Sequence, residues 1–204
     1  MAEQIQALVD EIQQLASTGN RVIIAIAGPP AAGKSTFVET LQQAIAGSVV
    51  VPMDGFHLDN SILESRGLLA RKGSPPTFDA LGYYHLIKRL RADEEIVIAP
   101  TFDRAADLSR AGAIEIPRSA RILLTEGNYL LLNQQPWQSL PELFDLTVKL
   151  SVPEVILSER LVQRWLDHGL SAEAALQRAE QNDLPNARLV LEASAKADRI
   201  INNF

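Results

Sequence analysis

The chain has 204 residues, of which 47% are hydrophobic and 22% charged, with a formal net charge of −6 and no cysteine. This length supports one globular core, so we expect a single domain spanning residues 1–204. The acidic balance argues against a nucleic-acid-binding protein, and the lack of cysteine excludes disulfides and thiolate metal sites. Residues 1–15 do not resemble a secretory signal and no apolar run is long enough to cross a membrane, so we expect a cytoplasmic protein without membrane association.

The first predicted elements are a helix, a buried strand and a second helix. Apolar side chains recur at helical spacing over residues 5–15, and Gly19-Asn20 ends this helix. Residues 21–27 are mostly apolar and β-branched, as in a buried strand, and residues 34–47 return to helical spacing. Between the strand and the second helix lies a full match to the phosphate-binding pattern Gly-x-x-x-x-Gly-Lys-[Ser/Thr], with the sequence Gly28-Pro29-Pro30-Ala31-Ala32-Gly33-Lys34-Ser35-Thr36.

This succession of strand, glycine-bounded turn and helix predicts a loop that binds the phosphates of a nucleotide. Backbone N–H groups at the start of the helix would point at the phosphates, with the positive end of the helix dipole behind them. Lys34 would reach the β- and γ-phosphates, and Ser35 would bind Mg²⁺. The alternative is an accidental glycine turn. The residues expected to contact the nucleotide are Gly28, Ala31, Ala32, Gly33, Lys34, Ser35 and Thr36.

The rest of the chain alternates strands and helices. Residues 49–51 predict a short strand, and residues 55–78 predict a long loop with one short helix near residues 62–69. The later predictions are, in chain order, a helix at 81–90, a strand at 96–102 paired with one at 113–116, strands at 122–124 and 146–152, helices at 154–167 and from Ser171, and a last strand at 200–201. This alternation predicts an α/β fold with a mostly parallel sheet covered on both faces.

Two carboxylates follow predicted strands, as the phosphate loop does. Because ligands gather at the carboxyl ends of parallel strands, Asp54 and Glu126 are expected near the phosphates. Asp54 could orient and deprotonate an attacking hydroxyl, with Phe56 as the wall of a small pocket. Glu126 could hold Mg²⁺ directly or through a water molecule. The alternatives are an aspartate that caps a turn and a glutamate in an ordinary turn.

Basic residues occur at two further places of interest. Arg160 and Arg164 stand four residues apart in a predicted helix, so both guanidiniums project from one face. They could neutralise the charge that develops in phosphoryl transfer, or they could belong to a solvated face. The cluster Arg71-Lys72-Gly73 could bind an anionic group of a substrate, or it could be a solvated loop.

Five segments carry a wider resemblance. They are, in order, residues 28–36, Met53-Asp54-Gly55-Phe56-His57, Arg71 to Asp79, Pro100 to Arg104, and Thr125 to Leu130. Together they resemble the P-loop small-molecule kinases that include uridine kinase, pantothenate kinase and phosphoribulokinase. The chain is most similar to the bacterial branch named after a fructose transport system kinase, which has similar segments around residues 164–171 and 182–187.

The resemblance implies an ATP- and Mg²⁺-dependent kinase that phosphorylates a hydroxyl of a small metabolite, such as the sugar fructose. A uridine-like nucleoside or pantothenate is the alternative acceptor. The implied fold is the three-layer α/β/α sandwich of P-loop NTPases, with a mostly parallel five-stranded sheet, a small β-hairpin insertion and a helical lid at about residues 154–183; a homodimer is also implied. The resemblance assigns Lys34, Asp54, Arg160 and Arg164 to catalysis, Ser35 and Glu126 to the metal, and Asp54, Phe56, His57, Arg71, Asp79, Phe102 and Arg104 to the acceptor.

Two other classes of protein also use a phosphate loop. A regulatory GTPase would need an Asn-Lys-x-Asp segment to read guanine, which is absent, and an Asp-x-x-Gly segment directly after a strand, where none is predicted. A nonenzymatic nucleotide-binding module has no need of Asp54 beside the phosphate site. Both classes remain as alternatives to the kinase.

Overall fold

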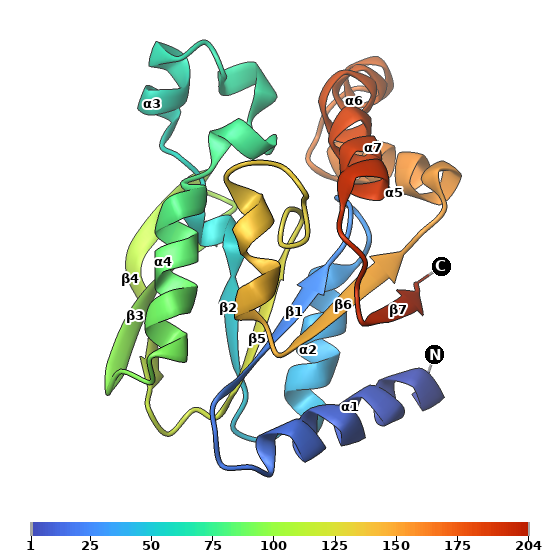
Figure 1. The fold of residues 1–204 in the computed structure, drawn as a ribbon. Coiled ribbons are helices and arrows are strands. Elements are labelled where there is room, and N and C mark those ends of the chain that lie inside the picture. Colours follow the sequence, from blue (N-terminus) through green and yellow to red (C-terminus); the bar gives the residue numbers. More distant parts are fainter. Residues whose placement is uncertain (1, 204) are drawn as a thin grey trace.

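The computed structural model describes residues 2–203, and its centre is a five-stranded sheet with the strand order β2-β5-β1-β6-β7 (Figure 1). Each strand runs parallel to its neighbours. This confirms the predicted parallel sheet, and the predicted short last strand forms one of its edges. The strands are β1 (Val22–Ala27), β2 (Val49–Pro52), β5 (Ile122–Gly127), β6 (Leu146–Ser151) and β7 (Arg199–Asn202).

The central strand β1 shows why both faces of the sheet are covered. All six of its residues are buried, and successive side chains point to opposite faces. Ile23, Ala25 and Ala27 belong to one hydrophobic cluster, whereas Val22, Ile24 and Ile26 belong to another. The two clusters are the two interfaces of a three-layer α/β/α sandwich, as predicted.

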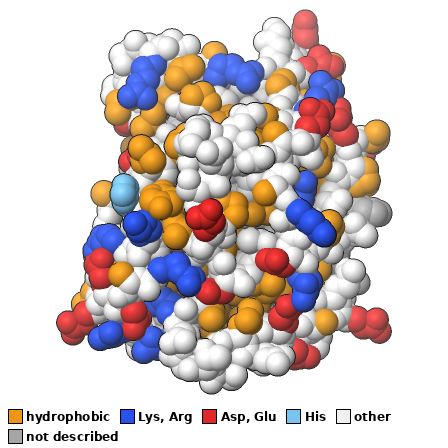
Figure 2. Space-filling model, viewed as in Figure 1, with side chains coloured by type: hydrophobic (Ala, Val, Ile, Leu, Met, Phe, Trp, Pro, Cys, Tyr) orange, Lys and Arg blue, Asp and Glu red, His pale blue; other side chains and the backbone are white. Residues whose placement is uncertain are grey.

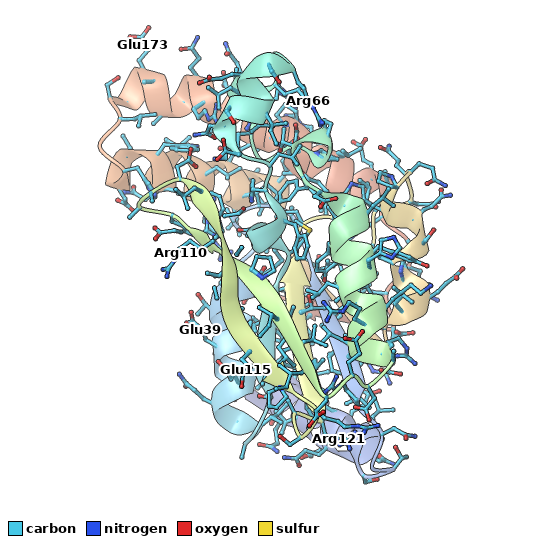
Figure 3. All side chains as sticks on the ribbon, turned by 90° about the vertical axis from the view of Figure 1, so that its left-hand side faces the viewer. Glu39, Arg66, Arg110, Glu115, Arg121 and Glu173 are labelled. Atoms are coloured by element: carbon cyan, nitrogen blue, oxygen red, sulfur yellow. The ribbon has the colours of Figure 1, made fainter. Side chains whose placement is uncertain are left out.

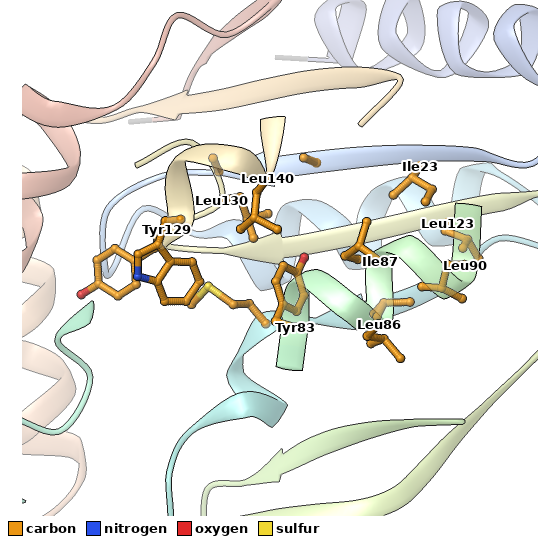
Figure 4. Close-up of a cluster of buried hydrophobic side chains, with 14 of the residues drawn as sticks. Ile23, Tyr83, Leu86, Ile87, Leu90, Leu123, Tyr129, Leu130 and Leu140 are labelled. Atoms are coloured by element: carbon orange, nitrogen blue, oxygen red, sulfur yellow. The ribbon is translucent and has the colours of Figure 1, made fainter. Parts of the chain in front are cut away.

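The helices divide between these two faces. On one face lie α1 (Ala2–Ala16) and α2 (Lys34–Ala44), whose apolar side chains pack with the Ile24 side of β1. On the other lie α4 (Ala80–Arg91) and the short turns η4 (Trp137–Ser139) and η5 (Pro141–Leu143). The helix α7 (Leu184–Ala193) contributes Val190 to the cluster on this face and Ala187 to the cluster on the Ile24 side. Figure 4 shows side chains of α4 packed against Ile23 and Leu123 of the sheet.

A two-stranded antiparallel hairpin stands apart from the main sheet. Its strands are β3 (Ile96–Asp103) and β4 (Leu108–Pro117). The hairpin was predicted, but β4 begins five residues earlier than the predicted strand at 113–116. Apart from the exposed Leu108, the added residues 108–112 are polar or small, so they carry no hydrophobic alternation for the sequence to reveal. Figure 3 shows Arg110 and Glu115 of this hairpin directed away from the body of the protein.

The segment that follows β2 is more regular than the predicted loop with one helix. It contains the expected helix α3 (Asn60–Ser65) and three 3₁₀ turns, η1 (Met53–Phe56), η2 (Leu69–Arg71) and η3 (Pro75–Thr77). A 3₁₀ turn of three or four residues is too short to produce a hydrophobic period, so sequence patterning cannot reveal it.

Three consecutive helical segments follow β6 and form what we call the helical arm, residues 154–183. They are α5 (Glu154–Asp167), α6 (Ala172–Arg178) and the π-helical turn η6 (Ala179–Asp183), which runs directly into α7. Gly169, with a φ of 86°, ends α5 as predicted, and Ser171 caps α6 through a hydrogen bond from the Ala174 N–H.

The surface in Figure 2 carries interspersed basic and acidic side chains, with no broad field of one sign on the face in view. This agrees with the modest negative net charge of the chain. Within residues 2–203, no helix is both long and apolar enough to cross a membrane.

Candidate active site

The strand register brings the three predicted site segments to one edge of the sheet. Glu126 on β5 lies opposite Ile26 of β1 on one side and Pro52 of β2 on the other. The chain leaves β1 for the phosphate loop and leaves β2 for Asp54 shortly after these positions. Glu126 therefore lies between the other two segments, at the carboxyl ends of the strands.

The phosphate loop has the backbone of an anion-binding turn. Ala31 and Gly33 have positive φ values, 63° and 81°, which is uncommon for alanine and concentrates at functional sites. The first backbone hydrogen bond of α2 runs from the Phe37 N–H to the Gly33 carbonyl. The N–H groups of Lys34, Ser35 and Thr36 precede it, so they have no partner within the helix and can bind an anion.

Lys34 is held at the bottom of the site by two oxygen atoms. Its ammonium donates to the Pro29 carbonyl at 3.0 Å and to Oδ1 of Asn128 at 2.6 Å, and the residue is 8% exposed. Burial lowers the pKa of Lys34, while the nearby Glu126 carboxylate acts in the opposite direction. Because both of its hydrogen-bond partners are neutral, the buried ammonium keeps its positive charge available for an anion such as a phosphate.

Ser35 and Glu126 provide a pair of oxygen ligands facing the same space. The Ser35 hydroxyl donates to Oε1 of Glu126 at 3.3 Å. Burial raises the pKa of Glu126, and the Lys34 ammonium opposes that shift and favours the carboxylate. Hydroxyl and carboxylate oxygens are the ligand types that Mg²⁺ prefers, so this donor set fits a magnesium ion.

Asp54 sits in η1 with its carboxylate engaged by the hairpin. Oδ2 accepts a hydrogen bond from Nη2 of Arg104 at 2.8 Å, and the Arg104 side chain is half exposed. The Asp54 backbone carbonyl accepts from Nδ1 of His57 at 2.8 Å. The arginine reaches Asp54 because it follows the last residue of β3, at the turn of the hairpin.

Aromatic rings line the side of the site next to Asp54. The His57 ring lies 4.0 Å from the Phe78 ring and 4.5 Å from the Phe102 ring, measured between centroids. Burial lowers the pKa of His57, which favours the neutral ring. Because Nδ1 donates to a backbone carbonyl, the neutral ring carries its free lone pair on Nε2.

Lys72 completes this side of the site. Its ammonium bonds Oδ1 of Asp107 at 2.9 Å and Oδ1 of Asn60 at 2.7 Å, and it lies 5.2 Å from the centroid of the Phe102 ring. The lysine comes from the segment after β2, and Asp107 comes from the turn of the hairpin. The ion pair therefore joins two segments of the chain that are 35 positions apart in the sequence.

All of these groups open into one cavity of about 740 Å³, large enough for a nucleotide and a small second molecule. Of the residues predicted from the sequence, the cavity is lined by Ala31, Gly33, Lys34, Ser35, Thr36, Asp54, His57, Phe102, Arg104, Glu126 and Arg164. Lys72, from the basic cluster at residues 71–73, also lines it, and lining residues that the sequence analysis did not select include Asn60, Asn128, Arg178, Asp183 and Asn186. Asn128 had a usable signal, because it follows Glu126 by two residues at the end of a buried strand.

Three predicted residues lie on the side of the phosphate loop that faces away from the cavity, and they do not line it. A side chain at Gly28 would contact Leu150, and buried Ala32 offers its carbonyl to the Asn203 side chain at 2.7 Å. The Arg160 guanidinium donates to the Ala31 and Asn203 carbonyls at 3.4 and 3.2 Å. Arg160 is one helical turn nearer the start of α5 than Arg164, so it meets the rear of the loop while Arg164 reaches the cavity.

Three residues predicted at the acceptor site also lie outside the cavity lining. Asp79 is exposed and caps α4, accepting a hydrogen bond from the Gly82 N–H at 2.8 Å. The Phe56 ring packs edge-on against Tyr83 at 5.3 Å, and Arg71 donates to the Gln181 carbonyl at 2.6 Å. In this structure Asp79 has the capping role that aspartate commonly takes at the start of a helix, whereas Asp54 does not.

Comparison with known proteins places this site in a family. Residues 23–203 match the model of the Phosphoribulokinase / Uridine kinase family. The chain belongs to this family. It is an ATP-dependent P-loop kinase, a phosphotransferase that acts on a hydroxyl group of a small molecule.

Relatives of this kinase cover most of its length. It is 34% identical to the "Putative uridine kinase C227.14" of Schizosaccharomyces pombe over 211 residues, covering 97% of this chain and 89% of the relative. Its sequence is 44% identical to that of a "putative fructose transport system kinase" from Silicibacter sp. TM1040, whose crystal structure is known. The two structures superpose with a TM-score of 0.89, and the match covers 95% of this chain and 98% of that one. A pantothenate kinase of Shewanella loihica is 34% identical over 163 residues, which cover 71% of this chain and 49% of that enzyme.

Proposed function

We propose that this kinase transfers the γ-phosphoryl group of ATP, with Mg²⁺, to a hydroxyl of an uncharged sugar such as fructose. The observation that carries the proposal is the position of Asp54. Its carboxylate opens into the same cavity as Lys34 and Glu126 on the phosphate side and as the His57 ring on the other side. A base in that position can meet a hydroxyl brought close to the phosphate.

On the phosphate side, the chain supplies positive charge and metal ligands. The N–H groups at the start of α2 and the Lys34 ammonium would bind the β- and γ-phosphates. Ser35 and Glu126 would hold Mg²⁺, which when bound neutralises phosphate charge and orients the nucleotide. Phosphoryl transfer needs mainly positioning and charge neutralisation, and these groups provide both.

On the acceptor side, Asp54 would accept the proton of the attacking hydroxyl. Arg104 hydrogen-bonds the same carboxylate, so the hydroxyl must share or displace that contact. Arg164 reaches the cavity from α5, and its guanidinium lies 5.7 Å from the centroid of the Trp165 ring. Burial lowers the pKa of Arg164, but an arginine remains charged and can stabilise the transferred group. The helical arm that carries Arg164 would act as a lid that excludes water.

The charges on the acceptor side favour an uncharged acceptor. Lys72 is paired with Asp107, and Arg104 is paired with Asp54, so the formal charges of these four side chains cancel. A neutral polyol can exchange hydrogen bonds with such pairs, whereas a charged acceptor would have to break one. The name of the 44% identical structure agrees with a sugar, while the relatives named uridine kinase and pantothenate kinase keep a nucleoside and pantothenate as alternatives.

An acceptor panel tests this proposal directly. Fructose and other neutral sugars should stimulate ADP release from ATP above the acceptor-free rate, more strongly than uridine, cytidine or pantothenate. Release of ADP and phosphorylation of the acceptor, followed by coupled assay and mass spectrometry, are the measurements. Stimulation by pantothenate or a nucleoside alone would contradict the sugar assignment but not the kinase. Acceptor-independent hydrolysis with strong guanine preference would favour a regulatory NTPase over the proposed kinase.

The metal role of Glu126 gives a second measurable result. Replacement of Glu126 by Gln removes the negative charge and should raise the Mg²⁺ concentration needed for half-maximal activity by roughly 10-fold or more. The matched control is Glu39→Gln, because Glu39 is an exposed residue of α2, the helix that carries Ser35. An unchanged magnesium titration in the Glu126 variant would exclude Glu126 as a metal ligand.

A further inference from the structure

Three hydrogen bonds join the helical arm to the segment after β2, and we call them the clasp. Nη1 of Arg71 donates to the Gln181 carbonyl at 2.6 Å, and Nδ2 of Asn182 donates to the Lys72 carbonyl at 3.0 Å. In the same region Nη1 of Arg178 donates to the Ala70 carbonyl at 2.9 Å. The bonds run in both directions, from each segment to the backbone of the other. Figure 3 shows Arg66 of the first segment and Glu173 of the arm at the same end of the molecule.

Asn182 is the most deeply placed member of the clasp. The residue is only 2% exposed, and its Oδ1 is buried with no hydrogen-bond partner. Leaving a buried acceptor unpaired costs free energy. The carboxamide is held instead through Nδ2, which donates to the Lys72 carbonyl. Asn182 lies in the π-helical turn η6, and such turns frequently occur at functional sites.

The clasp connects two groups that face the cavity. On one side, the backbone that Asn182 binds belongs to Lys72, whose side chain lines the acceptor half. On the other side, Asp183 follows Asn182 and accepts a hydrogen bond from Nε1 of Trp165 at 2.5 Å. The Trp165 ring in turn lies beside the Arg164 guanidinium. Arg71 and Asn182 are not among the residues that line the cavity, so they act on ligands only through these neighbours.

We propose that Asn182 and Arg71 are positioning residues that couple the helical arm to the segment 69–73. Nucleotide bound beneath the arm would restrict the motion of the arm. Through the hydrogen bonds of the clasp, it would also restrict the backbone at Lys72, whose side chain lines the acceptor half. Each site would then be completed only when the other is in place. The inference rests on the proposed function in one respect, namely that nucleotide binds at the phosphate loop.

Hydrogen–deuterium exchange of the intact chain with Mg²⁺ and a non-hydrolysable ATP analogue tests the coupling without an acceptor. In the parent protein the analogue should slow amide exchange both in residues 28–37 and in residues 66–73. In Asn182→Ala and in Arg71→Met, residues 28–37 should remain protected. Protection of residues 66–73 by the analogue should fall by roughly 3- to 10-fold, the effect of one lost hydrogen bond.

Two controls separate coupling from a general loss of structure. Arg71→Lys keeps a donor that can reach the Gln181 carbonyl, so it should restore protection of residues 66–73. Gln181→Ala removes an exposed side chain but keeps the carbonyl that Arg71 binds, so it should behave as the parent. The partly exposed Arg71 also provides a variant that is expected to fold should Asn182→Ala fail to do so.

The outcomes distinguish this inference from the proposed function. If the analogue protects residues 28–37 of the parent but leaves 66–73 unchanged, nucleotide binding stands and the coupling is overturned. Full protection of residues 66–73 in Arg71→Met overturns it as well. If the analogue fails to protect residues 28–37 at all, nucleotide binding at the phosphate loop is itself wrong.

Discussion

Replacing Lys34 by Met is expected to lower kcat/KM for phosphoryl transfer by about 10²-fold or more, the usual effect of removing one charge-stabilising group from a reaction centre. The Lys34 ammonium is buried and fixed by the Pro29 carbonyl and Asn128, so no other cation can move into its place without rearrangement. Methionine keeps much of the length of the buried stem, which limits the effect on folding.

ATP binding by calorimetry and steady-state kinetics with the best acceptor of the panel are the measurements for Lys34→Met. The control is Lys88→Met, which removes an exposed lysine on α4, away from the cavity lining. That variant should retain parental kinetics. If Lys34→Met binds ATP as tightly as the parent and transfers phosphate at the same rate, the assignment of residues 28–36 to the nucleotide fails.

Asp54→Asn should reduce kcat by about 10²-fold or more at saturating acceptor, because a positioned general base contributes at least that much. Asparagine preserves the size of the side chain and can still accept a hydrogen bond from Arg104. It cannot take a proton from the acceptor hydroxyl. ATP affinity should therefore change little, which separates loss of the base from loss of the site.

The same substitution at Asp79 is a matched control for Asp54→Asn. Asp79 caps α4 and lies outside the cavity lining, and asparagine is as good a helix cap as aspartate. Asp79→Asn should therefore retain near-parental kcat and stability. Equal loss of activity in the two variants would place Asp79 in the acceptor site, as the family resemblance implies, and would contradict a role for Asp79 in helix capping alone.

The sheet and the phosphate side could be predicted because their signals are local. A buried strand, a glycine-bounded loop and a following helix are contiguous, and parallel strands bring Asp54 and Glu126 to the same edge whatever the connections do. The predicted positions of these residues follow from strand ends alone. The proximity of Asp54 and Glu126 to Lys34 could therefore be predicted without knowledge of side-chain conformations.

The acceptor side could not be predicted in the same way, because it depends on contacts between distant loops. Lys72 meets Asp107 across 35 positions of sequence, and Arg71 turns from the cavity to the Gln181 carbonyl, 110 positions away. Neither contact leaves a periodic pattern. A motif marks Arg71 and Asp79 as belonging to the acceptor segment, but only the packed structure shows which side chains of that segment reach the cavity.

The acceptor side also has an unusual origin along the chain. Asp54, His57, Lys72, Arg104 and Asp107 all come from the stretch between β2 and β5, whereas the phosphate loop comes directly from β1. If the proposed function holds, most of the residues that select the acceptor come from one continuous stretch between neighbouring strands, which also contains α4. Exchanging residues 53–117 for the equivalent stretch of a related kinase is therefore expected to change the acceptor in a single graft, while the nucleotide-binding half keeps its own sequence.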